Sequence, residues 1–290
     1  MSKNSDSRYN EWLRFGISTH LYHDQRLSRE HLAQVSAYGF EAIELFATKA
    51  HFDYHDPAAI AQLHQWLKDT GLTLHSIHAP ITDTLAAGQW GTTFSIAFSD
   101  NAKRQAAVRE ADAALAIARE IPFGFAVVHL GTPAARASGG DNSRAAAVRS
   151  VDEICGVAEP LGVRVAVEVI PNDLSSATTL VTMLERDFDG TTVGLCMDFG
   201  HAHLMGDVPD AIETAAEHLI TTHVHDNRRR EDDHLVPYQG SIHWASALVT
   251  MRKIGYDGTY MMELANTGTP AAVLEEARRA RQRLERALAD

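Results

Sequence analysis

Four ionisable side chains stand at the ends of apolar stretches in the second half of the chain: Glu168, Asp198, His223 and Glu263. Carboxylates and an imidazole together suit divalent cations such as Zn²⁺, Mn²⁺, Co²⁺ and Fe²⁺. If these groups met without a cation, their burial and mutual repulsion would cost several kcal/mol. The residue types therefore predict a metal centre, provided that the fold brings the four stretches together.

The stretch at residues 193–201 reads Val-Gly-Leu-Cys-Met-Asp-Phe-Gly-His. Side chains alternate along a strand, so Met197 and Asp198 point to opposite faces, and Asp198 ends the strand on the side of the small residues. Gly200 permits a sharp turn, after which His201 lies near the carboxylate. The alternative is a buried aspartate that caps the next helix, with the histidine there by chance.

The whole chain alternates between short apolar segments and helical ones. The predicted strands are residues 15–20, 40–45, 72–80, 125–131, 163–170, 193–198, 220–226 and 259–264. The predicted helices are residues 28–39, 57–71, 101–121, 142–161, 176–186, 207–217, 244–254 and 270–289. Eight parallel βα units predict an α/β fold that closes into a (β/α)8 TIM barrel.

The rival fold is an open doubly wound sheet, which would need a glycine-rich loop after the first strand. Residues 19–22 read Thr-His-Leu-Tyr and do not provide one. Residues 1–290 are therefore expected to form one barrel domain, with residues 1–12 as a flexible tail.

Active sites of such barrels lie at the carboxyl ends of the strands. In the fifth strand the alternation directs Val167 outward and Glu168 inward, and the eighth strand directs Glu263 inward in the same way. In the seventh strand, Ile220, Thr222 and Val224 are predicted to point outward, and Thr221 and His223 inward. His225 shares the inward direction but lies two residues further on, so it ranks below His223.

Further histidines end other strands. His78 and His129 end the third and fourth strands, and each has the alternative of being a hydrogen-bonded core histidine. His20 and Glu44 end the first two strands and are candidates for substrate contacts. Six other histidines are expected at surface positions on helices or loops: His31, His51, His55, His64, His203 and His218.

The net charge and the cysteine content indicate which partners the protein can bind and in which cellular compartment it is expected. A formal net charge of −12 argues against nucleic acid as a partner. Cys155 and Cys196 give no disulfide framework and fit a reducing cytoplasm. The first ten residues are polar and no apolar run is long enough for a bilayer, so we expect a cytoplasmic location without membrane contact.

The ordered motifs resemble the xylose isomerase-like barrels. This superfamily joins sugar phosphate isomerases and epimerases with AP endonuclease family 2, the endonuclease IV-like nucleases. The resemblance spans residues 15 to about 287 and rests on residues 78–80 (His-Ala-Pro), 128–131 (Val-His-Leu-Gly), 167–168 (Val-Glu), 197–201, 223–226 (His-Val-His-Asp), 232–234 (Asp-Asp-His), 237–240 (Pro-Tyr-Gln-Gly), Trp244 and 262–264 (Met-Glu-Leu).

The resemblance implies two ligand sets. The epimerase-like set holds one ion through Glu168, Asp198, His223 and Glu263, and Glu168 and Glu263 act as the catalytic acid and base on opposite faces of the substrate carbon. The nuclease-like set adds His78, His129, His201, Asp232 and His234 and holds three ions. One to three ions of Zn, Mn, Co or Fe are therefore implied.

One residue departs from the family pattern. Tyr238 stands where the family usually has glycine after the proline, and a bulky side chain there is expected to reshape the loop near the substrate.

The leading hypothesis is a divalent-metal-dependent isomerase or epimerase of a sugar, keto-sugar or related polyol. Protons would move through a metal-stabilised enediolate. His20, Glu44, His201 and Arg229 are the candidates for binding this small, carbohydrate-like substrate. For the basic residues 228–230 the alternative is a solvated loop. The segment at residues 81–100, with Trp90 and Phe94, is expected to cover the site. A homo-oligomer is also possible by analogy.

Three alternatives remain open. An endonuclease IV-like phosphodiester hydrolase would use the fuller ligand set, but Asp232 and Asp233 reduce the positive charge of residues 228–230. A lyase or dehydratase on a related polyol would share the chemistry of the isomerase. The last alternative is a noncatalytic sugar-binding barrel.

Overall fold

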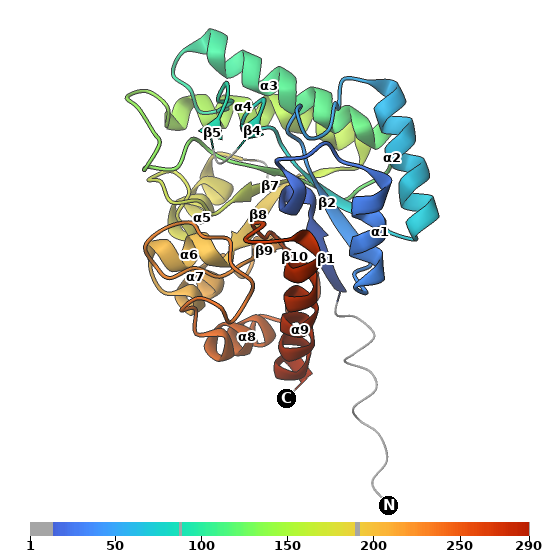
Figure 1. The fold of residues 1–290 in the computed structure, drawn as a ribbon. Coiled ribbons are helices and arrows are strands. Elements are labelled where there is room, and N and C mark those ends of the chain that lie inside the picture. Colours follow the sequence, from blue (N-terminus) through green and yellow to red (C-terminus); the bar gives the residue numbers. More distant parts are fainter. Residues whose placement is uncertain (1–13, 87–88, 189–191, 290) are drawn as a thin grey trace, which may run out of the picture.

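The structure is a computed structural model that describes residues 14–86, 89–188 and 192–289, so the tail expected at residues 1–12 lies outside the described residues. Eight parallel strands close into a barrel in the order β1-β10-β9-β8-β7-β6-β3-β2 (Figure 1). The strands of the barrel are β1 (Arg14–Ser18), β2 (Ala42–Phe46), β3 (Thr73–His78), β6 (Phe125–Val128), β7 (Arg164–Glu168), β8 (Val193–Asp198), β9 (Leu219–Val224) and β10 (Thr259–Met262). The predicted (β/α)8 barrel is confirmed.

Helices surround the barrel and connect its strands (Figure 1). The α-helices are α1 (Arg29–Ala37), α2 (Pro57–Thr70), α3 (Asn101–Leu115), α4 (Arg144–Ala158), α5 (Ala177–Arg186), α6 (Phe199–Met205), α7 (Val208–Ala215), α8 (Trp244–Lys253) and α9 (Pro270–Ala289). The short 3-10 helices are η1 (Thr19–Tyr22), η2 (Ala116–Arg119) and η3 (Glu159–Leu161). Among the described helices, none combines the length and apolar character needed to cross a bilayer.

Local sequence explains where the helices begin and end. The Asp56 side chain accepts a hydrogen bond from the N–H of Ala58 at the start of α2, and Pro57 occupies the first helical position. Gly71 ends α2 with a left-handed φ of 71°. Asp100 caps α3 and Ser176 caps α5 through the same type of bond.

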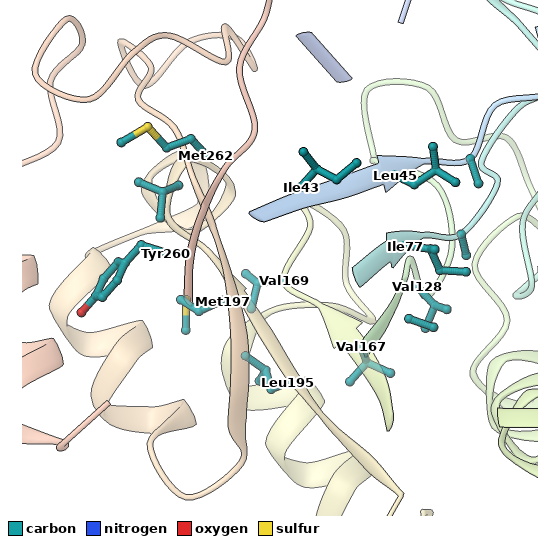
Figure 2. Packing of buried hydrophobic residues seen from close by; sticks show 14 of the residues in the cluster. Ile43, Leu45, Ile77, Val128, Val167, Val169, Leu195, Met197, Tyr260 and Met262 are labelled. Atoms are coloured by element: carbon teal, nitrogen blue, oxygen red, sulfur yellow. The ribbon is translucent and has the colours of Figure 1, made fainter. Parts of the chain in front are cut away.

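Two layers of apolar side chains follow from the alternation along the strands. Val167, Leu195, Met197 and Tyr260 belong to the large cluster between strands and helices, as Figure 2 shows. Val127, Ala166 and Cys196 form a small separate cluster inside the barrel. The inward and outward directions predicted for the fifth and sixth strands are therefore confirmed.

The direction predicted for Ile220 is wrong. Its side chain packs against the inner cluster, next to the position of Gly194. The reason is a register shift in the pairing of β8 with β9, where Leu195 pairs with Leu219 but Cys196 pairs with Thr221. Such a shift reverses the alternation locally, and sequence periodicity alone does not reveal it.

The segment at residues 81–100 contains β-structure. Leu85–Ala86 (β4) pairs with Gln89–Trp90 (β5), and Thr82 forms a bridge with Thr93. The Arg136 guanidinium lies 4.9 Å from the centre of the Trp90 ring, which joins this segment to the loop after β6. The segment connects β3 to α3 at the end of the barrel where the site lies.

Candidate metal centre

Three groups of ionisable side chains, two of which share Glu168, lie at the carboxyl end of the barrel. The ligand atoms of each group are within 4.8 Å of one another. We name them the histidine pair group (His78, His129, Glu168), the central group (Glu168, Asp198, His223, Glu263) and the loop group (His201, His225, Asp232, His234). The structure thus brings together all nine residues of the nuclease-like ligand set, and His225 in addition.

The central group contains the four residues whose types and positions predicted a metal centre: Glu168, Asp198, His223 and Glu263. The Nδ1 atom of His223 lies 3.0 Å from Oε1 of Glu168, 3.5 Å from Oε2 of Glu263 and 3.9 Å from Oδ2 of Asp198. The side chains of Glu168, Asp198 and His223 are fully buried. Three buried carboxylates around one imidazole leave an excess of negative charge that a divalent cation would neutralise.

The histidine pair group has the spacing of a tetrahedral metal site. Nε2 of His78 is 3.3 Å from Nε2 of His129, and Oε2 of Glu168 is 3.3 and 3.0 Å from these two nitrogens. Metal bonds of about 2.0–2.1 Å at tetrahedral angles place ligand atoms ~3.3–3.4 Å apart. Oε2 of Glu168 is buried and makes no hydrogen bond of acceptable geometry with any described residue. The donor set therefore fits a cation better than hydrogen bonds.

Glu168 belongs to two groups. Its Oε1 atom faces His223, whereas its Oε2 atom faces His78 and His129. Because β7 lies between β6 and β8, a carboxylate at its end reaches both neighbouring groups. Glu168 would therefore be shared by ions bound in the two groups.

The loop group combines residues of α6, β9's end and the loop before α8. Oδ2 of Asp232 lies 3.0 Å from Nε2 of His201 and 3.2 Å from Nε2 of His234. His225 directs its Nε2 toward Asp198 at 3.0 Å and lies 3.9 Å from Oδ1 of Asp232. Sequence reasoning ranked His225 below His223, although the same alternation directed both inward.

Backbone carbonyls fix the orientation of three of these rings. The Nδ1 atoms of His78, His201 and His234 lie 2.9, 3.0 and 2.9 Å from the carbonyl oxygens of Ala79, Val169 and Glu263. A carbonyl accepts only, so each Nδ1 carries a proton, and Nε2 is the atom that a cation would bind. This arrangement is typical of metal-ligating histidines.

His223 has the opposite orientation, and Glu44 is the cause. Nε2 of His223 donates to Oε2 of Glu44 at 3.0 Å, and the Ser76 hydroxyl donates to the same oxygen at 2.8 Å. The Glu44 side chain is fully buried on the side of His223 away from the central group. Glu44, expected to contact substrate, therefore lies one layer below the site and orients a candidate ligand.

Charge pairing accounts for the pKa values at the site. Burial alone would raise the pKa of Asp232, but attraction to His234 and His201 holds it well below the ordinary value. Burial likewise opposes charge on His234, yet the Asp232 carboxylate raises the pKa of His234 to about 10. Without a cation these groups hold protons that a bound ion would displace.

Asp198 serves two purposes at once. Its Oδ1 atom accepts a hydrogen bond from the N–H of His201 at 2.6 Å and so caps α6. The capping role considered from the sequence is thus real, but it does not exclude membership of the central group. The cap also places His201 at the site.

Asp226 anchors the loop that carries Asp232 and His234, and sequence reasoning missed it. Its Oδ2 atom accepts hydrogen bonds from Nε1 of Trp244 at 2.8 Å and from the N–H of Tyr238 at 3.0 Å. Its Oδ1 atom accepts from the N–H groups of Asn227 and Ile242 at 2.9 and 3.1 Å. A buried carboxylate with four donors fixes both ends of the loop.

The predicted substrate contacts His20 and Arg229 differ in position. The His20 ring stacks on His234 with 4.8 Å between centres, and its Nδ1 lies 3.1 Å from the carbonyl oxygen of Leu264. Arg229 is exposed and donates to the carbonyl oxygen of Gly206 at the end of α6. His20 therefore adjoins the loop group, whereas the Arg229 guanidinium is engaged elsewhere.

Two histidines expected at the surface are buried instead. His51 is fully buried and its Nδ1 lies 2.6 Å from the carbonyl oxygen of Gln25. His203 is 8% exposed and bonds to the Ser241 hydroxyl. Both lie in connections that fold back on the barrel, which helical or loop character alone does not predict.

The sequence profile of the xylose isomerase-like TIM barrel family matches residues 32–286. The chain belongs to this family. The match confirms the resemblance drawn from the motifs, and it covers every residue of the three groups.

Curated proteins and solved structures similar to this xylose isomerase-like barrel agree with the fold. The uncharacterized protein MJ1311 of Methanocaldococcus jannaschii is 26% identical over 261 residues, which cover 88% of this chain and 84% of that protein. The inosose isomerase of Bacillus licheniformis is 29% identical over 137 residues, 43% of this chain and 48% of that protein. The crystal structure of a D-tagatose 3-epimerase-like protein superposes with a TM-score of 0.76 at 23% identity, over 95% of this chain and 97% of that one.

Proposed function

We propose that the chain is a divalent-metal-dependent isomerase or epimerase of a sugar, keto-sugar or related polyol. The observation that carries the proposal is the central group, in which Glu168 and Glu263 converge with Asp198 and His223 at the barrel mouth. The similarity to an inosose isomerase and to a D-tagatose 3-epimerase-like protein supports the same class of substrate.

Asp198, His223 and the two glutamates would hold the ion, which when bound stabilises negative charge that develops on substrate oxygens. We propose Zn, Mn, Co or Fe as the bound metal. The three groups together would hold one to three ions. His223 is fixed by Glu44, so the ligand geometry is present before an ion arrives.

The two glutamates are suited to different shares of the proton transfer. Glu168 has both oxygens directed at histidines, with contacts of 3.0 Å on each side. Glu263 is 3.5 Å from His223 and 3.7 Å from His234, and its side chain keeps 4% of its surface exposed. Glu263 is therefore the freer base for the carbon-bound proton, a role worth ~10²–10⁴-fold in rate. Glu168 returns the proton or steadies the oxygen.

His20 is proposed to contact a substrate hydroxyl. Its Nδ1 is turned to the carbonyl oxygen of Leu264, so Nε2 is the atom left for other partners. Nε2 of His201, the other histidine considered for this role, faces Asp232 at 3.0 Å and belongs to the loop group. His20 stacks on His234 and so extends the wall of the site beyond the loop group.

Solvent exchange tests the proposal. The protein, loaded with Mn²⁺ or Co²⁺, is incubated in D₂O with a panel of ketoses and inososes, and deuterium at the carbon next to the carbonyl is followed by NMR. We expect incorporation that a chelator abolishes and added metal restores. Glu263→Gln should lower the rate by at least about 10²-fold, whereas Glu217→Gln, at an exposed position, should not. Full activity of Glu263→Gln would refute the two-glutamate scheme.

A phosphodiester hydrolase is the second candidate, because the three groups lie at the same end of the barrel and two of them share Glu168. The net charge of −12 opposes it, and Arg228 and Arg229 already donate to the carbonyl oxygens of Gln239 and Gly206. Salt-sensitive nicking of an abasic duplex, without deuterium exchange into any sugar, would favour the hydrolase over the isomerase.

A further inference from the structure

We infer that His225 is a positioning residue, which commits the Asp198 carboxylate to the central group and keeps it out of the loop group. The inference deepens the proposed function and rests on its metal dependence. It gives a task to a histidine that belongs to neither ligand set implied by the resemblance, although its ring lies among the candidate ligands.

The hydrogen bond between His225 and Asp198 has a defined direction. Nε2 of His225 lies 3.0 Å from Oδ1 and 3.1 Å from Oδ2 of Asp198, and both side chains are fully buried. An ionised carboxylate accepts only, so Nε2 carries the proton and has no lone pair left for a cation. Nδ1 of the same ring is buried and has no hydrogen-bond partner among the described residues. His225 therefore acts on a candidate ligand and is not one itself.

Two donors together fix the Asp198 carboxylate. The first is the N–H of His201, which donates to Oδ1 at 2.6 Å and caps α6. One donor leaves the carboxylate free to rotate about the Cβ–Cγ bond, because that torsion has broad minima. The second donor, Nε2 of His225, restricts this rotation. Oδ2 of Asp198 then stays on the side of the central group, 3.9 Å from Nδ1 of His223.

The same N–H also lies next to the carboxylate of the loop group. Nε2 of His225 is 3.9 Å from Oδ1 of Asp232, so its proton occupies Asp198 on the side that faces the loop group. The ligand groups of the described residues reflect this separation: Glu168 belongs to two groups, whereas Asp198 belongs to the central group alone. An ion in the loop group would therefore be held without Asp198.

Packing sets the direction of the His225 ring before any ion binds. The ring stacks on that of His234 at an interplanar angle of 12°, with 4.0 Å between centres, so its face and not a nitrogen meets His234. A Cβ atom at Gly200 would collide with three atoms of the His225 ring, so glycine in the first turn of α6 makes room for it. The donor to Asp198 is thus preorganised.

A pair of variants separates the hydrogen bond from the packing. His225→Gln keeps an amide N–H near the position of Nε2, whereas His225→Leu fills the space without a donor. Competition with a chromogenic chelator measures the affinity for Co²⁺, and the central ion is the one that Glu263→Gln loses. We expect His225→Leu to weaken this ion about 10–100-fold and His225→Gln to restore most of the loss.

The control is His203→Gln, which should leave the affinity unchanged. His203 is also a buried histidine of α6, but it bonds to the Ser241 hydroxyl and belongs to none of the three groups. Wild-type affinity in His225→Leu would overturn the inference. An equal loss in His225→Leu and His225→Gln would also overturn it, because the volume of the ring and not its donor would then matter.

A wild-type measurement covers the case in which His225→Leu does not fold. In ¹⁵N-labelled protein loaded with ¹¹³Cd, NMR shows which ring nitrogens carry protons and which rings couple to the metal. A proton on Nε2 of His225 in the loaded protein supports the inference, and coupling of this ring to ¹¹³Cd overturns it.

The inference and the proposed function can fail separately. An affinity that depends on His225, without deuterium exchange into any sugar, would refute the proposed function alone. Metal-dependent exchange together with unchanged affinity in His225→Leu would refute the inference alone.

Discussion

At the scale of single residues, the buried partners of the ligands matter as much as the ligands. Glu44 does not belong to the central group, but its hydrogen bond orients His223. We predict that Glu44→Gln lowers metal affinity about 10–100-fold, the usual effect of losing such a partner. Competition with a chromogenic chelator measures the affinity. An unchanged affinity would mean that packing alone orients His223.

The control for this variant is Ser76→Ala. Ser76 donates to the same Glu44 oxygen, so its removal should have a smaller effect in the same direction.

His51 predicts a pH dependence of stability away from the site. Burial lowers the pKa of His51 to about 4, whereas an unfolded histidine titrates near 6.5. Between these values the unfolded chain binds the extra proton, so the free energy of unfolding decreases as pH falls from about 6.5 to 4, by up to about 3 kcal/mol. Urea unfolding at several pH values should show a smaller decrease in His51→Gln. His55→Gln, at an exposed position, serves as the control. If the free energy of unfolding falls equally with pH in the wild type and both variants, the prediction is contradicted.

At the scale of elements, the loop of residues 227–243 depends on Asp226 rather than on regular structure. Three non-glycine residues of this loop have a positive φ: Arg229 (63°), His234 (46°) and Tyr238 (75°). Such backbone costs roughly 1–2 kcal/mol per residue, and the hydrogen bonds to Asp226 oppose that cost. The positive φ of Tyr238 explains why glycine suits this position in the family.

Tyr238 gains contacts that glycine lacks. Its ring lies 5.7 Å from that of Trp244, and the Arg283 guanidinium of α9 lies 3.7 Å from its centre. The side chain thus packs between α8 and α9, and this accounts for a bulky residue on left-handed backbone.

We predict that Asp226→Asn frees this loop while the barrel stays folded. An amide can no longer accept four hydrogen bonds, and each lost bond to a charged acceptor is worth about 1.5–3 kcal/mol. Limited proteolysis should cut within residues 227–243, and the loop group should lose its ion before the central group does. Glu231→Gln, at an exposed position of the same loop, gives the comparison. Resistance to protease equal to that of the wild type would show that other contacts hold the loop.

At the scale of the whole molecule, metal binding and folding should be linked. The three groups draw residues from β3, β7, β8, β9 and α6 and from the segments after β6, β9 and β10, so the ligands meet only in the folded barrel. Metal at a hundred times its dissociation constant should add about 2.7 kcal/mol per site to the free energy of unfolding. A rise in melting temperature on loading measures this, and an unchanged temperature would contradict metal binding by the folded state.

The same loading should release protons. Because Asp232 raises the pKa of His234 to about 10, this ring is protonated at pH 7 without metal and must lose its proton to ligate. Calorimetry in buffers of different ionisation enthalpy counts the released protons. We expect the release of at least one proton for each ion that binds in the loop group. A binding heat that does not depend on the buffer would contradict this.

The sequence by itself determined the barrel, the end of the barrel that carries the site, and the four residues of the central group. The reason is that period-two alternation and strand order are local properties, and parallel strands align their carboxyl ends. Glu168, Asp198 and Glu263 were found because each follows an outward apolar residue at a strand end.

Only the tertiary structure decided the rest. Ile220 turned inward because of a shift between two strands, and His51 became buried because a connection folds over it. Glu44 lies beneath His223, and His225 lies beside Asp198, because residues distant in sequence pack there. Distances between strands set which imidazole nitrogen faces which carboxylate, and no periodicity along a single strand contains that information.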